Sequence, residues 1–298
     1  MTKTNSLSIV LPAKNEALGL ENLLPKLRQS YPQAEILVIN DGSTDDTEKI
    51  CHENNITVIT HPYSLGNGAS IKTGARNSTG DITVFMDADG QHDPADIAKL
   101  IEKMEQGYEM VVGARRANTH AGLFRRFANA FYNRLASIMT GYAIKDLTSG
   151  FRAVRTRHFR RFLYLLPNGF SYPTTSTMAF FRSGLPVAYV PINAGKREGK
   201  SHISLVKDGI RFFIIILKVG SLFSPMRLFL PVSATLFLLG IGYYSYTYIL
   251  TARFTNMSAL LLTSSLITFM MGLISEQISS LHYKDIEKEQ RKIERNSD

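Results

Sequence analysis

The sequence is poor in several features that would narrow its function. It has a single cysteine, Cys51, so no disulfide can form within the chain, and a reducing, cytoplasmic environment is expected. The N-terminal stretch MTKTNSLSIVLPAKNE has only a few apolar residues before Pro12 and Lys14, too few for the core of a signal peptide. We therefore expect the N-terminus to stay in the cytoplasm.

Acidic residues are in deficit, with 25 Asp and Glu against 34 Lys and Arg in 298 residues, a formal charge of +9. Such a balance suggests a polyanionic partner, which could be nucleic acid, anionic lipid or a phosphorylated substrate. Long apolar runs are missing from the first 200 residues, whereas uncharged residues dominate after Arg211. The pattern predicts a soluble domain in front and a membrane-bound part behind.

Two uncharged runs lie near the end of the chain. Leu228 to Leu250 holds 23 consecutive uncharged residues, which as a helix would span about 34 Å and cross a hydrocarbon core about 30 Å thick. Thr255 to Ser275 holds another 21. We predict two transmembrane helices joined by the turn TARFT; the alternative is a buried hairpin of a soluble core.

Basic residues flank these runs on the outside, with only Arg253 between them, so the positive-inside rule places both termini in the cytoplasm of a multi-pass inner-membrane protein. The preceding stretch DGIRFFIIILKVGSLFSP is strongly apolar with isolated charges, and it predicts an interfacial helix on the membrane surface. A third packed helix of the soluble domain is the alternative. The charged tail KDIEKEQRKIERNSD is expected to be a solvated helix or disordered.

The first 200 residues alternate short β-branched runs with helical segments. SLSIVLPA, AEILVIND, ITVIT and DITVFMDAD resemble strands, and the spacing between them predicts an α/β fold with a mainly parallel sheet and helices on both faces. Ligands of such sheets bind beyond the carboxyl ends of the strands. Residues 12–16, 41–43, 87–91 and 113–116 should therefore share one rim.

Acidic and amide side chains on this rim predict a metal site. Asp87 and Asp89 follow a buried strand, and Gly90 makes a turn there easy. Together with Gln91 they offer oxygen ligands without a nearby cysteine, so Mg²⁺ or Mn²⁺ is expected rather than zinc. Magnesium prefers one or two carboxylates plus phosphate oxygens, which suits a nucleotide diphosphate. Taken alone, an Asp-x-Asp pair is weak evidence for a metal, because short acidic pairs often lie solvated in loops; its position at the end of a strand strengthens the prediction.

Two further motifs face the same rim. Asp41 ends the second strand, where a carboxylate commonly accepts hydrogen bonds from a ribose or a base. Gly66 and Gly68 in GNGASIKTGAR precede a helix and give a weak phosphate-loop signal; close packing of that helix explains them equally well.

Taken in order, the motifs of the chain resemble those of the GT-A, family-2 glycosyltransferases, and within them the polyprenyl-phosphate glycosyltransferases like dolichol-phosphate mannose synthase. The resemblance extends over nearly the whole chain and ends with the two spans. It implies a GT-A domain at 1–202, interfacial helices at 203–226, transmembrane helices at 227–281 and a tail at 282–298. The motifs that carry it are SIVLPAKNEA, VINDGSTDDT, GNGASIKTGAR, FMDADGQHDP, VVGARR, DLTSGFRA and REGKSH.

The resemblance implies an inverting hexosyltransferase that moves a sugar from a UDP- or GDP-sugar to a dolichyl or undecaprenyl phosphate. Uridine and glucose follow only from the likeness to bacterial bactoprenol glucosyltransferases. Arg115 and Arg125 match arginines that hold the acceptor phosphate, and Arg197 matches a basic residue of a loop near the donor. The implied substrate contacts are Pro12, Ala13, Asn15, Glu16, Asp41, Asp87, Ala88, Asp89, Arg115, Arg125, Asn129 and Arg197; the metal ligands are Asp87, Asp89 and Gln91, and the catalytic residues Asp89, Arg115 and Arg125.

The chain departs from the family pattern at Asn129, where relatives usually have serine, and at His202, where lysine usually follows GKS. The charge map agrees with a phosphorylated lipid, because residues 113–161 hold eleven Lys or Arg and one acid, Asp146. A generic membrane-facing basic patch explains several of these arginines equally well. Asp146 either orients the acceptor or pairs with an arginine, the role we favour slightly.

Three rivals remain. Processive polysaccharide synthases share the fold but resemble one another in a Gln-x-x-Arg-Trp motif, and this chain has no tryptophan. An inactive membrane scaffold of the same fold would lack the intact metal and phosphate motifs, and another lipid- or glycan-directed family-2 enzyme would keep them. Nucleic-acid binding is disfavoured, because the basic cluster lies beside membrane segments. Association into homo-oligomers within the membrane is left open.

Overall fold

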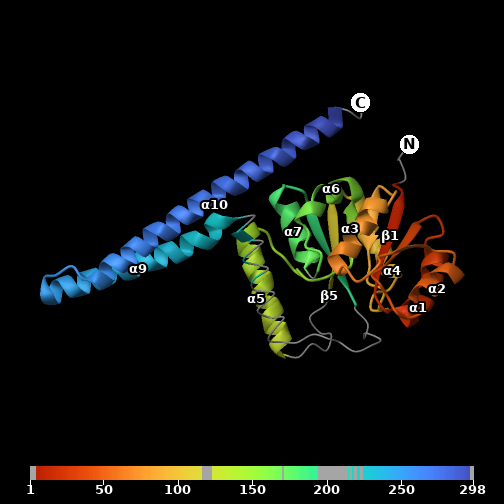
Figure 1. The fold of residues 1–298 in the computed structure, drawn as a ribbon, viewed down its shortest axis with the longest axis horizontal. Coiled ribbons are helices and arrows are strands. Elements are labelled where there is room, and N and C mark those ends of the chain that lie inside the picture. The colour runs from red at the N-terminus through yellow and green to blue at the C-terminus, as the bar shows by residue number, and fades with distance from the viewer. Residues whose placement is uncertain are drawn as a thin grey trace. The chain divides into compact units, whose positions relative to one another are not determined.

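The structure is a computed structural model that describes residues 5–115, 123–169, 171–193, 214, 217, 220, 221 and 224–295 (Figure 1). For 123–129 and 282–295 the description is limited to the backbone. Arg197 and His202, and all but a few positions of the predicted interfacial helix at 203–226, therefore lie outside the described residues. Contacts divide the chain into two units: Met1–Arg134 with Tyr142–Phe212, and Leu135–Gly141 with Phe213–Asp298.

The first unit contains a seven-stranded sheet in its described part, with the order β3-β2-β1-β4-β6-β5-β7. Strand β6 runs antiparallel to β4 and β5, whereas the other pairs are parallel. The predicted mainly parallel α/β sheet is thus confirmed. The strands are β1 (Leu7–Ala13), β2 (Glu35–Asn40), β3 (Thr57–Thr60), β4 (Ile82–Phe85), β5 (Met110–Arg115), β6 (Arg152–Arg155) and β7 (Val187–Ile192).

Helices cover both faces of the sheet because side chains of a strand alternate between its faces. On β1, Ile9 and Leu11 join the core formed with α1 and α4, and Val10 points the other way, against α3. There an added Cβ at Gly74 would lie 2.3 Å from a Val10 methyl. The helices of this unit and its link are α1 (Ala17–Ser30), α2 (Thr47–Glu53), α3 (Asn67–Asn77), α4 (Ala95–Glu105), α5 (Leu123–Thr140), α6 (Thr156–Arg161) and α7 (Tyr172–Arg182), with a short 3₁₀ turn at Leu163–Leu165.

The second unit is built on an antiparallel hairpin of α9 (Pro225–Thr251) and α10 (Asn256–Arg295) (Figure 1). Pro225–Thr251 and Asn256–Leu281 are long and apolar enough to cross a membrane, with mean hydropathies of 1.5 and 1.9. Only 11% and 17% of their most apolar windows are buried within the chain, which contradicts the alternative of a buried core hairpin. Helix α10 continues beyond the span, so the backbone of the tail is helical as far as Arg295.

Small and polar residues bring the two hairpin helices together. The Ser233 hydroxyl donates to the Ser265 carbonyl at 3.0 Å, and the Ser265 hydroxyl donates to the Ser233 carbonyl at 2.9 Å. Gly240 packs against Leu262 on the facing helix, and an added Cβ there would lie 2.9 Å from a Leu262 methyl. Close approach at small residues and hydrogen bonds between helices are the usual means of packing helices in lipid.

Candidate functional site

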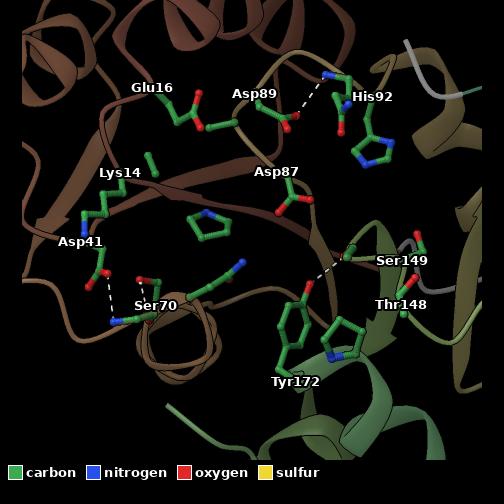
Figure 2. Close-up of a pocket in the computed structure, with 18 of the residues that line it drawn as sticks. Lys14, Glu16, Asp41, Ser70, Asp87, Asp89, His92, Thr148, Ser149 and Tyr172 are labelled. Carbon is green, nitrogen blue, oxygen red and sulfur yellow. Dashed lines mark hydrogen bonds between the residues drawn. The ribbon is translucent and has the colours of Figure 1, made fainter. Parts of the chain in front are cut away.

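A pocket of about 850 Å³ opens at the carboxyl edge of the sheet in the first unit (Figure 2). Its walls are the residues that follow β1, β2 and β4, the end of β5, the N-terminal turn of α3, and two segments at 148–150 and 171–173. The size is typical of a site for a small organic ligand. The rim predicted from the parallel sheet is therefore a real concavity.

Most residues predicted for the site meet in this pocket. Those that line it are Pro12, Ala13, Asn15, Glu16, Asp41, Asp87, Ala88, Asp89, Gln91 and Arg115. Arg125 and Asn129 belong to α5 by their backbone, but their side chains lie outside what the structure describes, as does Arg197. The roles predicted for Arg125 and Asn129 at the acceptor and for Arg197 near the donor thus stay predictions.

Asp87 and Asp89 follow β4, and both line the pocket (Figure 2). Asp89 is buried, and its Oδ1 accepts a hydrogen bond from the Gln91 amide at 3.2 Å across the turn at Gly90, whose φ is +72°. Asp87 faces Gly150, where an added Cβ would lie 3.1 Å from its Oδ2. Glycine at that position keeps the space in front of the carboxylate open.

The donor set of this segment fits a cation that arrives with its own oxygen ligands. No cluster of three or more His, Cys, Asp or Glu side chains placed to bind a metal occurs among the described residues. Two carboxylates and the amide oxygen of Gln91 nevertheless match Mg²⁺ or Mn²⁺, which take one or two carboxylates and complete their shell with phosphate oxygens and water. A structural zinc site is not formed here.

Asp41 lies at the other side of the pocket, and its carboxylate organises the loop that follows β3. Oδ1 accepts from the Leu65 amide at 2.8 Å and contacts His61 Nδ1 at 2.9 Å; Oδ2 accepts from the Ser64 hydroxyl at 2.7 Å and the Gly66 amide at 2.9 Å. Burial acts to raise the pKa of Asp41, but these hydrogen bonds outweigh it and hold the pKa below its usual value. The loop is built around this anion.

The turn after β1 is held in place by the segment after β2. Asn15 adopts a left-handed backbone with φ of +55°, and its side-chain oxygen accepts from the Thr44 amide at 2.8 Å. The Asn15 amide donates to the Ser43 hydroxyl at 2.9 Å, and the Ala17 amide donates to Asp45 Oδ2 at 3.1 Å. The Asn15 side chain therefore fixes the pocket wall as well as lining it.

Close packing explains Gly66 and Gly68 better than a phosphate loop does. An added Cβ at Gly68 would lie 2.0 Å from the Pro167 carbonyl oxygen, and one at Gly66 would lie 2.6 Å from the Asn168 oxygen. The Gly68 amide donates to the Gly169 carbonyl at 3.0 Å. The Ala69 amide donates to the Asn168 carbonyl at 2.9 Å. Amides that serve the 167–169 segment are not available to a phosphate.

Arg115 ends β5 and is bound by Asp146. Its Nε donates to Asp146 Oδ2 at 2.9 Å, Nη2 donates to Oδ1 at 3.1 Å, and Nη2 also donates to the Thr148 hydroxyl at 2.6 Å. Burial would lower the pKa of Arg115, but Asp146 more than compensates and raises it. Burial likewise acts to raise the pKa of Asp146, and Arg115 and the Thr148 amide hold it below its usual value. The prediction that Asp146 pairs with an arginine is confirmed.

These depressed carboxylate pKa values predict acid sensitivity. Asp41 and Asp146 stabilise the fold fully above their unfolded pKa, near 3.8, and lose that contribution as the pH falls through the lower folded values. The thermal midpoint of the full chain in detergent should be level from about pH 7 to about pH 5 and fall below about pH 4. Asp146→Asn should be less stable at neutral pH and flatter in acid; a curve parallel to that of the wild type would contradict this role.

The sequence did not single out Arg152, whose side chain is fully buried beneath the pocket. Its Nη1 donates to the Pro173 carbonyl at 3.0 Å, the Ser176 hydroxyl at 2.8 Å and the Thr177 hydroxyl at 3.1 Å, and Nη2 donates to the Ser149 carbonyl. It thereby ties the 148–150 wall to the 171–173 wall. This part of the sequence is rich in basic residues, and residue type alone does not show that Arg152 is a buried one.

His92 and Ser171 are two more pocket residues that the sequence did not indicate as functional. The His92 ring stacks on Phe151 with centroids 4.8 Å apart, and burial lowers its pKa to about 4, so the ring is neutral at physiological pH. Ser171 has a left-handed backbone with φ of +97° although it is not glycine. A backbone outlier of this kind is a feature of three-dimensional context that residue type does not reveal.

Comparison with known proteins identifies the family to which the chain belongs. The sequence profile described as Glycosyl transferase family 2 matches residues 8–163, and the one described as GtrB C-terminal hairpin matches residues 224–281. The chain is 35% identical over 161 residues to an undecaprenyl-phosphate 4-deoxy-4-formamido-L-arabinose transferase of Klebsiella pneumoniae, covering 51% of this chain and 49% of the relative. It is 32% identical over 166 residues to the enzyme of that name from Proteus mirabilis, covering 52% and 50%.

The chain thus spans about half the length of these two relatives. A third relative, glycosyltransferase AglJ of Haloferax volcanii, is 24% identical over 303 residues, which cover 97% of this chain and 98% of the relative. Among solved structures, glucosyl-3-phosphoglycerate synthase of Mycobacterium tuberculosis with Mn²⁺ and UDP-glucose superimposes with a TM-score of 0.61 at 21% identity, covering 72% of this chain and 79% of that one. That likeness confirms the GT-A type of fold.

Proposed function

Because the chain belongs to glycosyltransferase family 2, we propose that it transfers a sugar from a nucleotide diphosphate sugar to a polyprenyl phosphate at the cytoplasmic face of the membrane. The observation that carries the proposal is the pocket holding Asp87 and Asp89 at the carboxyl edge of the sheet, in a chain that ends in two apolar helices. The names of the Klebsiella and Proteus relatives, which act on undecaprenyl phosphate, support this class of acceptor.

The donor is proposed to lie along the pocket from Asp41 to Asp87. The nucleoside would occupy the wall formed by Pro12, Asn15 and Asp41, where the ordered loop after β3 gives a fixed surface. The diphosphate would lie at Asp87 and Asp89. The UDP-glucose and Mn²⁺ in the mycobacterial synthase support a uridine nucleotide and Mn²⁺ or Mg²⁺, although a GDP-sugar fits the same chemistry.

Asp87, Asp89 and Gln91 would hold the metal through their oxygens. When bound, the ion supplies Lewis-acid stabilisation of the negative charge that develops on the departing diphosphate. Asp89 is held for this role by the Gln91 amide, and Ala88 between the two carboxylates packs against Gly19 of α1, where an added Cβ would lie 2.2 Å from the Ala88 carbonyl oxygen. The chain therefore presents the carboxylates on a fixed backbone.

The acceptor phosphate would attack the anomeric carbon from the face opposite the diphosphate and invert its configuration. One bond forms between the anomeric carbon and a phosphate oxygen, and the bond from that carbon to the diphosphate breaks. A phosphate monoester has a second pKa near 6, so it is largely dianionic at neutral pH and needs no strong base. Its positioning is assigned by resemblance to Arg115, Arg125 and Asn129, with Arg197 near the donor.

The chain is proposed to be divided as its sequence predicts: a catalytic domain at 1–202, interfacial helices at 203–226, two membrane spans at 227–281 and a cytoplasmic tail at 282–298. By the positive-inside rule, the basic flanks favour a cytoplasmic position for both termini. The basic segment 113–161 would then meet anionic lipid and the lipid-linked phosphate. Homo-oligomers within the membrane would be compatible with this arrangement.

One assay tests the proposal directly. The full chain in detergent is incubated with undecaprenyl or dolichyl phosphate, Mg²⁺ or Mn²⁺, and a panel of UDP- and GDP-sugars. We expect one donor to give a glycosylated lipid and free nucleotide diphosphate in equal amounts. Metal-dependent nucleotide binding without product for any donor would overturn the proposal in favour of an inactive scaffold, and nucleotide release without glycolipid would indicate a different acceptor.

A further inference from the structure

The wall of the pocket beyond Asp87 is polar, but its polar groups are mostly engaged within the protein. Figure 2 shows Asp87 between Asp41 on one side and Thr148 and Ser149 on the other. The Ser149 hydroxyl donates to the Gly113 carbonyl at 2.7 Å, and the Tyr172 hydroxyl donates to the Gly150 carbonyl at 2.7 Å. The Thr148 hydroxyl is held by Arg115 and Asp146. None of these three hydroxyls needs a ligand to satisfy it.

Two groups of this wall are exceptions. The Ser171 hydroxyl and the His92 Nδ1 are both buried and have no hydrogen-bond partner within the described part of the chain. Ser171 is 2% exposed and His92 is 7% exposed. Buried polar atoms in proteins are almost always paired, so an unpaired one beside a pocket points to a partner that the ligand supplies.

Ser171 does not make the helix-capping hydrogen bond that its position would allow. It is the N-cap residue of α7, where a serine hydroxyl normally accepts from an amide of the first turn, yet it makes no side-chain cap hydrogen bond. Its φ of +97° would suit glycine better. Ser171, a residue of the pocket wall, therefore has a buried hydroxyl that does not make the capping hydrogen bond.

Among the described residues, the two arginines at this wall donate hydrogen bonds within the protein, which bears on the kind of group that Ser171 and His92 would meet. Arg115 donates from Nε and Nη2 to Asp146 and from Nη2 to Thr148, and Arg152 donates from Nη1 and Nη2 to the carbonyls and hydroxyls beneath the wall, while its buried Nε has no hydrogen-bond partner within the described part of the chain. A serine hydroxyl and an imidazole nitrogen can donate to or accept from a hydroxyl group, whereas phosphate is usually bound by arginine or lysine. In a nucleotide diphosphate sugar bound from Asp41 to Asp87, the part that extends past Asp87 is the sugar.

We infer that Ser171 and His92 are specificity-determining residues that hydrogen-bond hydroxyl groups of the donor sugar. The inference rests on the proposed function and goes beyond it by naming the residues that select the sugar. The Phe151 ring under His92 holds the imidazole flat, so its nitrogens have a fixed direction. Substitutions at these two residues should change which sugar is accepted without changing the affinity for the nucleotide.

The test uses Ser171→Ala, Ser171→Gly and His92→Phe in the full chain, with Ser183→Ala as control. Ser183 is an exposed serine at the far end of α7. For the donor that wild-type protein uses, kcat/KM should fall about tenfold in each of the three variants and stay unchanged in the control. The Kd of UDP or GDP with Mn²⁺ should be the same in all five proteins. Phenylalanine keeps the stack on Phe151, so His92→Phe removes only the ring nitrogens.

Deoxy and fluoro analogues of the donor sugar identify the sugar hydroxyl that each residue contacts. One analogue should lose activity with the wild type and show no further loss with Ser171→Ala, because the hydroxyl that Ser171 meets is already missing. Ser171→Gly distinguishes the loss of the hydroxyl from the relief of backbone strain. Glycine adopts a left-handed backbone without strain, so if Ser171 had only a structural role, this variant would be at least as active as the wild type. Wild-type kcat/KM in both Ser171→Ala and His92→Phe would overturn the inference, whereas a wild type without transfer from any donor would overturn the proposed function.

Discussion

Replacing Asp89 with asparagine should lower kcat/KM for sugar transfer by about a thousandfold. A metal that acts as a Lewis acid on a departing diphosphate is worth several kcal/mol of transition-state stabilisation, and each 1.4 kcal/mol is about tenfold in rate. Asparagine keeps the shape of the side chain and an oxygen that can accept from the Gln91 amide, so it removes the charge and leaves the turn intact. The measurement is initial-rate kinetics with the full chain in detergent, polyprenyl phosphate and saturating Mn²⁺.

The matched control is Asp46→Asn, which removes one negative charge from an exposed position outside the pocket. It should retain the rate of the wild type. Thermal midpoints of both variants should lie close to the wild-type value, and the affinity for UDP should lose its dependence on Mn²⁺ in Asp89→Asn alone. Transfer by Asp89→Asn within about tenfold of wild type would remove Asp89 from the metal site.

Replacing Arg152 with alanine should destabilise the first unit by about 3 to 5 kcal/mol. The guanidinium donates to the Pro173 and Ser149 carbonyls and to the Ser176 and Thr177 hydroxyls. The Pro173 carbonyl keeps the hydrogen bond from the Ser176 hydroxyl, whereas the Ser149 carbonyl would lose the Arg152 donor at a cost of roughly 1 to 3 kcal/mol. The cavity left by the largest of the fully buried side chains adds to this loss. The thermal midpoint of the full chain should fall by about 10 °C.

Arg155→Ala is the control for Arg152. It removes the same side chain three residues along the same strand, where the guanidinium is partly exposed and donates to Asn5 Oδ1 at 2.9 Å. Its cost should stay below about 1 kcal/mol. Arg152→Lys tests the hydrogen bonds separately from the charge, because one ammonium cannot reach both walls as a planar guanidinium does. Equal midpoints for Arg152→Ala and Arg155→Ala would show that the tie between the walls carries no stability.

The position of the pocket could be predicted from sequence because it depends on strand ends. Runs such as ITVF are short and β-branched, and in a parallel sheet their carboxyl ends lie at one edge wherever the strands sit in the order. Asp41, Asp87 and Arg115 were therefore placed together correctly without knowledge of the strand order. The same reasoning found the hairpin, since span length and charge flanks are properties of single segments.

The residues that the sequence did not indicate depend on contacts between distant segments. Arg152 is an arginine among many, and only the antiparallel insertion of β6 between β4 and β5 puts it under the pocket. The left-handed backbone of Ser171 is likewise not indicated by its residue type, since serine rarely adopts it.

The reciprocal serine contact in the hairpin has a mechanical consequence. A slide of one helical turn, 5.4 Å, along either axis would part both hydroxyls from both carbonyls at once and move Leu262 away from Gly240. In the membrane setting proposed for the hairpin, no water would replace the lost partners, so a slide of the helices would leave polar groups unpaired. The two serine contacts therefore oppose relative sliding of α9 and α10 and favour their movement as one body.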